Sequence, residues 1–227
     1  MSLENCEIAQ DSLSNLITQK KALYEYPRHG HLMTANEEPQ LKEKKMKMKI
    51  CLIGEGAVGK TSLIRRYVVD EFDDKYLQTL GTKVSKRELK IEVENEGTLI
   101  KVDMTIWDIM GQKGFRELLK DAYFYGAKGI IAVCDVTRRN TLEDLDDWIE
   151  GVYNVSGKIP IQFLANKADL EDEVTMSEKD LEQAAKAYDS RYYFTSAKTG
   201  VNVERAFLEL ARKIGIEEAT KESKKAT

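Results

Sequence analysis

A glycine-rich stretch, GEGAVGKTS, lies between the apolar run MKICLI and a helix-like segment. From Gly54 to Thr61 it matches the pattern G-x-x-x-x-G-K-S/T. Glycines leave the backbone N–H groups of such a loop free to surround phosphate oxygens, and the following helix directs its positive end at the anion. The stretch therefore predicts a site for the phosphate tail of a nucleotide, with Lys60 on the outer phosphates and the Thr61 hydroxyl on Mg²⁺. The residues expected to contact the phosphates are Gly54, Gly56, Ala57, Val58, Gly59, Lys60, Thr61 and Ser62.

A second motif, WDIMGQ, ends the strand-like run VDMTIW. Asp108 is placed to hold Mg²⁺ through a water molecule, because a hard dication prefers oxygen ligands. The Gly111 amide is expected to follow a terminal phosphate and Gln112 to orient an attacking water. The motif is short, and an ordinary turn at the end of a strand is an equal explanation of it taken alone.

A third motif, NKAD, follows the apolar run IQFLA. The Asp169 carboxylate can accept two hydrogen bonds from guanine, whereas adenine would leave it unpaired, a mismatch that discriminates by ~10⁴-fold or more. Asn166 is expected at the same site, and Lys167 along the plane of the base. Alone, the motif is also compatible with a helix-capping Asx turn.

A fourth motif, TSAK, follows the run RYYF and gains its meaning from coming fourth in order. We expect Ser196 to brace Asp169, the Ala197 amide to meet the guanine oxygen, and Lys198 to cover the base.

The elements that must position these motifs alternate along the chain. Strand-like runs, mostly apolar, alternate with helix-like segments from residue 47 onward, and a hairpin is predicted around Asn95-Glu96-Gly97. This order predicts an α/β fold: a mainly parallel six-stranded sheet, one antiparallel edge strand, and helices on both faces. Ligands of such sheets bind beyond the carboxyl ends of the strands, which is where all four motifs fall.

The 227-residue chain has a net charge of -4, which gives no reason to propose nucleic acid as a ligand. We expect a G domain over 47–216, preceded by an extension over 1–46 that is partly helical or disordered, with an amphipathic helix near residues 13–24. A polar tail is expected over 217–227. The three cysteines lack metal-type spacing and predict reduced thiols in an intracellular setting. The chain shows no secretory signal, no run of ~20 apolar residues and no prenylatable cysteine, so we expect a cytoplasmic protein without a covalent membrane anchor.

Taken together, the four motifs make residues 47 to 214 resemble the small GTPases of the Ras superfamily, with the P-loop NTPase fold. The resemblance is closest to the Rab-like branch. It implies that Thr79, in TLGTK, is a second magnesium ligand and γ-phosphate sensor. It also places Phe72 against the base and Tyr76 over the phosphates, and Trp107 and Tyr123 in core packing or partner contact.

The resemblance implies a switch that cycles between GTP and GDP, with Mg²⁺ bound, in signal transduction or vesicle trafficking. Lys60, Gly111 and Gln112 are the expected catalytic residues, and Gly56 leaves room for a water and a partner's arginine. No arginine in a motif position is an obvious internal finger, so we expect slow intrinsic hydrolysis, on the order of 10⁻⁴ s⁻¹. Expected partners are an exchange factor, a GTPase-activating protein and effectors, around a monomer. The alternative is a nucleotide-holding interaction module with little or no hydrolysis.

Overall fold

The computed structural model describes residues 42–73, 78–79, 81–93, 97–111 and 121–225. The chain divides into two units, Met1–Glu38 and Pro39–Thr227, and every described residue belongs to the second. The expected helix near residues 13–24 lies outside the described residues, as do Tyr76 and Gln112.

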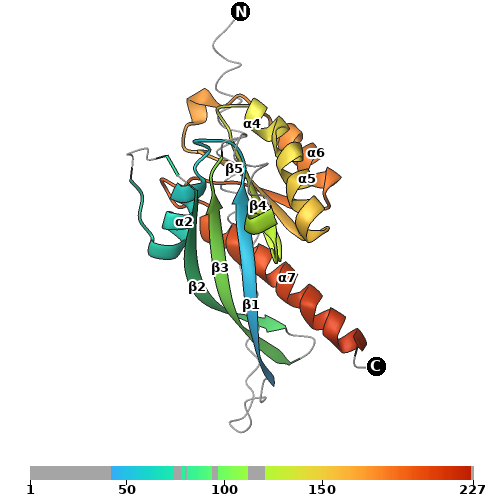
Figure 1. The fold of residues 1–227 in the computed structure, drawn as a ribbon. Helices are drawn as coiled ribbons and strands as arrows, with labels where there is room; N and C mark the ends of the chain where they lie inside the picture. The colour runs from blue at the N-terminus through green and yellow to red at the C-terminus, as the bar shows by residue number, and fades with distance from the viewer. Residues whose placement is uncertain (1–41, 74–77, 80, 94–96, 112–120, 226–227) are drawn as a thin grey trace, which may run out of the picture. The chain divides into compact units, whose positions relative to one another are not determined.

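A six-stranded sheet with the order β2-β3-β1-β4-β5-β6 forms the centre of the second unit (Figure 1). Edge strand β2 runs antiparallel to β3, and all other neighbours are parallel. This is the predicted sheet, including its one antiparallel edge. The strands are β1 (Lys42–Ile53), β2 (Thr82–Val93), β3 (Thr98–Ile109), β4 (Gly129–Asp135), β5 (Ile161–Asn166) and β6 (Arg191–Phe194).

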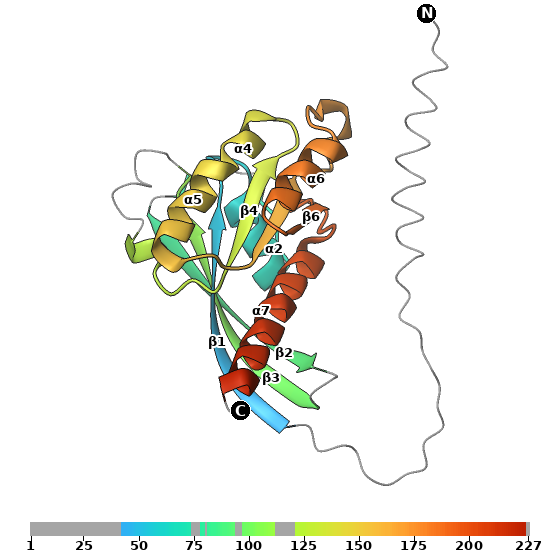
Figure 2. The ribbon, with the colours of Figure 1, turned by 90° about the vertical axis from the view of Figure 1, so that its right-hand side faces the viewer.

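Helices pack on both faces of the sheet, as the alternation predicts (Figure 2). On one face, α2 and α7 bury apolar side chains such as Leu63 and Phe207 against β1 and β3. On the other face, α5 packs on β4 and β1 with side chains such as Trp148, and α6 packs on β5 and β6 with side chains such as Leu181. The helices are α2 (Lys60–Val69), α4 (Asn140–Glu143), α5 (Leu145–Ser156), α6 (Glu178–Ala187) and α7 (Val203–Lys225), with a short 3₁₀ turn, η2 (Glu171–Glu173).

Strand β1 begins at Lys42, earlier than the predicted start of the domain at 47. The predicted boundary at 47 divides the segment KEKKMKMK, because its composition is dominated by lysine and does not resemble that of a strand. Its pattern instead alternates with period two, so Met46 and Met48 pack into the core while Lys45 and Lys47 face solvent. One edge of this extension pairs with β3, from Thr98 onward.

Helix α7 continues to Lys225, through most of the predicted polar tail over 217–227. Contacts that are distant in sequence hold this part of the helix. Ala219 is buried, the Lys128 ammonium lies 3.3 Å from a Glu218 carboxylate oxygen, and Lys44 pairs with Glu222. The polar composition of the segment therefore reflects one solvated face of a helix.

Candidate nucleotide site

The loop between β1 and α2 has a backbone that only glycine permits at two positions. Gly54 has φ +130°, and a Cβ there would lie 2.1 Å from the Val133 carbonyl oxygen. Gly59 has φ +100°, and a Cβ there would lie 2.2 Å from Asn166 Nδ2. Both backbone conformations are essentially closed to residues with a Cβ. The loop therefore packs closely against β4 on one side and against the Asn-Lys-Ala-Asp loop on the other.

Lys60 opens α2 and is buried, with its ammonium turned back into the loop. Its Nζ donates to the Gly54 carbonyl at 2.7 Å and to the Glu55 carbonyl at 2.8 Å. Burial lowers the pKa of Lys60 to about 8, while the nearby Asp108 carboxylate opposes that shift. A desolvated cation of this kind is stabilised by an anion such as a phosphate.

Three oxygen-bearing side chains meet beside Lys60. The Thr61 hydroxyl lies 2.9 Å from the Thr79 hydroxyl and donates to Asp108 Oδ2 at 2.5 Å. Burial raises the pKa of Asp108, and its buried Oδ1 has no hydrogen-bond partner among the described residues. An oxygen-only donor set with one unsatisfied carboxylate oxygen is what a hard dication binds, so the residues present fit Mg²⁺.

Gly111 follows β3 and lies against the loop that precedes α2. A Cβ on Gly111 would come within 2.5 Å of the Glu55 carbonyl group and 2.6 Å of the Gly56 nitrogen. Its backbone therefore lies beside the loop in which the phosphates are expected. Gln112, the next residue, lies outside the described residues.

Asn166 ends β5 and joins the second half of the site to the first. Its side chain is buried; Nδ2 donates to the Val58 carbonyl at 2.9 Å. Its Oδ1 accepts from the Thr195 hydroxyl at 3.3 Å and from the Ala197 amide at 3.2 Å. The Ala197 amide, expected to meet the guanine oxygen, thus already donates to Asn166.

The predicted brace on Asp169 is present: the Ser196 hydroxyl donates to Asp169 Oδ1 at 2.5 Å. The Ser196 oxygen in turn accepts from the Thr199 amide at 3.0 Å. These bonds hold one carboxylate oxygen of Asp169. Asp169 itself is half-buried.

Two residues that were not predicted from the sequence support the loops that follow β5 and β6. Asp135 ends β4 with a fully buried carboxylate, and the Lys167 ammonium lies 2.6 Å from its Oδ2. Arg66 on α2 donates from Nε to the Ala197 carbonyl at 2.9 Å and from Nη2 to the Lys198 carbonyl at 2.7 Å. The sequence offers one feature that could have identified Asp135, a carboxylate at the carboxyl end of an apolar strand. It offers no such feature for Arg66.

The aromatic residues named from the family resemblance pack against the two cores. Phe72, after α2, is half-buried against the core cluster that contains Ala197. Trp107 and Tyr123 are half-buried against the opposite cluster, and the Lys49 ammonium lies 3.8 Å from the centre of a Trp107 ring. Both keep exposed surface, so core packing and partner contact are each compatible with the structure.

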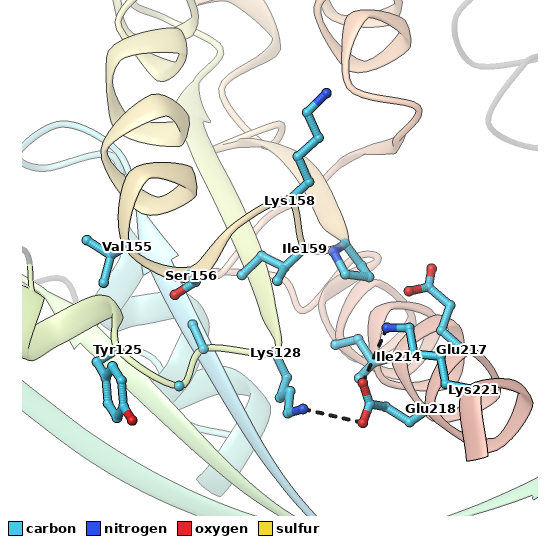
Figure 3. Close-up of a pocket in the computed structure, with 13 residues that line it drawn as sticks. Tyr125, Lys128, Val155, Ser156, Lys158, Ile159, Ile214, Glu217, Glu218 and Lys221 are labelled. Carbon is cyan, nitrogen blue, oxygen red and sulfur yellow. Dashed lines mark hydrogen bonds and ion pairs between the residues drawn. The ribbon is translucent and has the colours of Figure 1, made fainter. Parts of the chain in front are cut away.

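A cavity of about 460 Å³ lies at the other end of the described strands (Figure 3). It is lined by Ala127 and Lys128, which precede β4, and by Ile159 and Pro160, which precede β5. It is therefore at the amino ends of the strands, away from all four motifs. Its Lys128 and Lys221 ammonium groups both lie next to Glu218.

The four motif loops thus meet at one edge of a doubly covered sheet, an arrangement that defines a P-loop nucleotide-binding protein. A model of the Ras family matches residues 49–216. The chain is 38% identical over 167 residues to the Ras-related protein Rab-13 of Rattus norvegicus, covering 73% of this chain and 79% of that protein. It is 35% identical over 170 residues to Rab-21 of Geodia cydonium (74% and 71%), and 34% identical over 167 residues to human Rab-8B (73% and 77%).

The chain therefore belongs to the Ras family, as a Rab-like small GTPase. Like other members, it binds GTP, hydrolyses it to GDP and acts as a switch between the two states. Nothing in the fold or the comparisons favours the alternative of an interaction module without hydrolysis.

Proposed function

We propose that the two halves of the site read the two ends of a guanine nucleotide. Asp169 accepts hydrogen bonds from the guanine ring, Lys167 and Lys198 flank it, and Lys60 with the amides of the loop before α2 holds the phosphates. The observation that carries this proposal is the hydrogen bond from Asn166 to the Val58 carbonyl, which ties the base-reading loop to the phosphate loop.

We propose that Thr61, Thr79 and Asp108 hold the magnesium ion, with Asp108 acting through a water. When bound, the ion supplies positive charge beside the outer phosphates. Thr61 and Thr79, whose hydroxyls now contact each other, would turn toward it. Thr79 is also the proposed sensor of the γ-phosphate, because its hydroxyl would bind the ion only while GTP is present.

For hydrolysis, we propose that Gln112 orients the attacking water while Lys60 and the loop amides stabilise the charge that develops. The Gly111 amide donates to the γ-phosphate. We expect intrinsic turnover on the order of 10⁻⁴ s⁻¹, raised by an activating protein that supplies an arginine. Replacing Gln112 by Leu should lengthen the lifetime of bound GTP without changing GDP affinity. An unchanged GTP lifetime would remove Gln112 from the mechanism.

The proposed partners are an exchange factor, an activating protein and effectors that recognise the GTP-bound form of a monomer. None of the helices among the described residues combines the length and apolarity needed to cross a bilayer. A cytoplasmic location is proposed because Cys51 and Cys134 are free, buried thiols, as in reducing compartments.

Identification of the nucleotide that co-purifies with the protein tests the proposed site directly. We expect GDP in a near-stoichiometric amount after denaturation and chromatography, as slow release retains it through purification. Recovery of an adenine nucleotide instead would contradict the role of Asp169.

A further inference from the structure

The peptide group between Gly56 and Ala57 lies in the loop before α2, and the loop's own backbone preferences do not fix its orientation. Ala57 has φ +62°, a left-handed conformation that is unfavourable for a residue with a Cβ. Gly56, on the other side of this peptide, has no Cβ to restrict it. Neither flanking residue therefore fixes the orientation of this peptide plane. A contact from outside the loop is needed to do so.

Arg138, in the turn after β4, makes such a contact with this peptide. Its Nη2 donates to the Gly56 carbonyl oxygen at 3.0 Å, while its Nε lies 3.0 Å from Asp135 Oδ2. Asp135 is itself fixed, because its fully buried carboxylate also accepts from the Thr137 amide and hydroxyl at 3.0 and 2.8 Å and pairs with Lys167. A planar guanidinium can bond to two acceptors at once in this way.

The direction of the Gly56 carbonyl determines the direction of the Ala57 N–H, because both belong to the same peptide group. Lys60 holds the carbonyls of Gly54 and Glu55 from inside the loop, whereas Arg138 is 39% exposed and reaches the next carbonyl from outside. In a trans peptide the C=O and N–H groups point in opposite directions. With the Gly56 carbonyl turned outward onto Arg138, the Ala57 N–H is directed away from Arg138.

We propose that Arg138 is a positioning residue, which fixes the Gly56–Ala57 peptide so that the Ala57 N–H faces the phosphates of the bound nucleotide. The proposal rests on the nucleotide site proposed above. Through Asp135 and Lys167, the same contacts connect the phosphate loop to the loop that reads the base. Arg138 does not act as an internal arginine finger, because its guanidinium is committed to Asp135 and Gly56.

The test compares Arg138→Ala with Arg139→Ala in the full chain. Arg139 is a matched control because it bonds to Glu143 and Asp180 at the surface and not to the loop. The rate of release of a fluorescent GDP, with Mg²⁺ present, should rise about tenfold in Arg138→Ala, the usual effect of losing one hydrogen bond to a charged group. It should be unchanged in Arg139→Ala.

Phosphorus NMR of bound GDP provides a signature that a general loss of stability would not produce. The β-phosphate resonance should move in Arg138→Ala and stay in place in Arg139→Ala. Arg138→Lys keeps the charge but cannot bond to both acceptors in the same fork, so it should release GDP at an intermediate rate. If Arg138→Ala does not fold, Arg138→Met, which keeps the apolar stem, replaces it in both measurements.

Two results would overturn the proposal while leaving the nucleotide site intact. The first is equal GDP release and equal spectra for the variants at 138 and 139. The second is unchanged GDP release with slower single-turnover GTP hydrolysis in Arg138→Ala, which would make Arg138 a directly catalytic residue. Failure of the wild-type protein to bind GDP would instead reject the proposed site, and this proposal with it.

Discussion

The two halves of the site differ in how completely the protein satisfies them. The base half (Asn166, Asp169, Ser196 and Ala197) has hydrogen bonds between its own members and two supporting bonds from Arg66. The phosphate half (Lys60, Thr61, Thr79 and Asp108) keeps a buried cation with a lowered pKa and a carboxylate oxygen without a hydrogen-bond partner among the described residues.

From this difference we infer that the two halves have different roles in nucleotide binding. The base half is preorganised by its own contacts, so we expect it to select a base without rearranging. The phosphate half keeps a buried ammonium group and one carboxylate oxygen without a described partner, and we expect a bound polyanion and cation to complete it. The ligand is therefore expected to stabilise the fold mainly through the phosphate half, and the base half is expected to determine which nucleotide binds.

The largest expected effect comes from breaking the base half at Asp169. Asp169→Asn should weaken GDP binding by about 10⁴-fold and shift preference toward xanthine nucleotide, because the new amide donates where guanine also donates. The exposed Asp172, in η2, supplies the control Asp172→Asn. Competition of each nucleotide against a fluorescent GDP measures the effect. Equal GDP affinity in both variants would contradict the role of Asp169.

The second prediction concerns the point where the halves touch. Gly59→Ala should destabilise the protein by about 3 kcal/mol, since its Cβ would lie 2.2 Å from Asn166 Nδ2 at a φ of +100°. Gly56→Ala should change stability by less than about 1 kcal/mol, because the nearest atom to its Cβ is 4.0 Å away. Urea unfolding of both variants measures the two changes in the free energy of unfolding. Similar stabilities would show that the halves are not in tight contact.

The third prediction tests the phosphate half at its metal. Asp108→Asn should weaken Mg²⁺ affinity about 10- to 100-fold, as is typical when a residue that holds a metal through water is changed. Measured as GDP release against Mg²⁺ concentration, the midpoint should shift by that factor. Asp103→Asn, an exposed position on the same strand, is the control. A midpoint that moves equally in both variants would argue against a metal site at Asp108.

The smallest expected effect concerns Asp135, which supports both halves. Burial raises its pKa, but hydrogen bonds from Lys167, Thr137 and Arg138 outweigh burial and lower it below its ordinary value of 3.8. The ionised carboxylate therefore stabilises the fold above pH 3.8, and this contribution is lost as the pH falls through the lowered folded-state pKa. Asp135→Asn should lower stability by about 1 kcal/mol at neutral pH, a modest value because both cationic partners are partly exposed.

Unfolding of Asp135→Asn and wild type across pH measures this effect. The two curves should converge as the pH falls from 3.8 through the lowered folded-state pKa of Asp135, because the wild-type carboxylate becomes protonated there. A difference that persists unchanged at lower pH would assign the effect to packing instead of charge.

Much of this site was predictable because the determinants are local. The glycines, Lys60 and Thr61 occupy a strand–loop–helix junction whose backbone requirements can be inferred from spacing alone. The Ser196–Asp169 contact was predicted from the fourth motif, TSAK, whose meaning depended on its place in the order of the motifs and not on its own short sequence. The position of the sheet's antiparallel edge followed from the hairpin signal at Gly97.

What could not be predicted depends on partners distant in the chain. Arg66 lies on an unremarkable helical face, and its acceptors are carbonyls at 197 and 198 that become neighbours only in the folded sheet. The early start of β1 was hidden because lysine composition masks a period-two pattern whose apolar members are only Met46 and Met48. Helix α7 likewise extends through its contacts with Lys44 and Lys128.

Isothermal titration calorimetry of the nucleotide-free protein, with Mg²⁺ present, tests the central claim most directly. GDP should bind at a single site with an affinity at least about 10³-fold higher than that of ADP, because Asp169 pairs with guanine and is left unpaired by adenine. Equal heats and affinities for the two nucleotides would contradict the account of the base half. No binding of either would contradict the whole site.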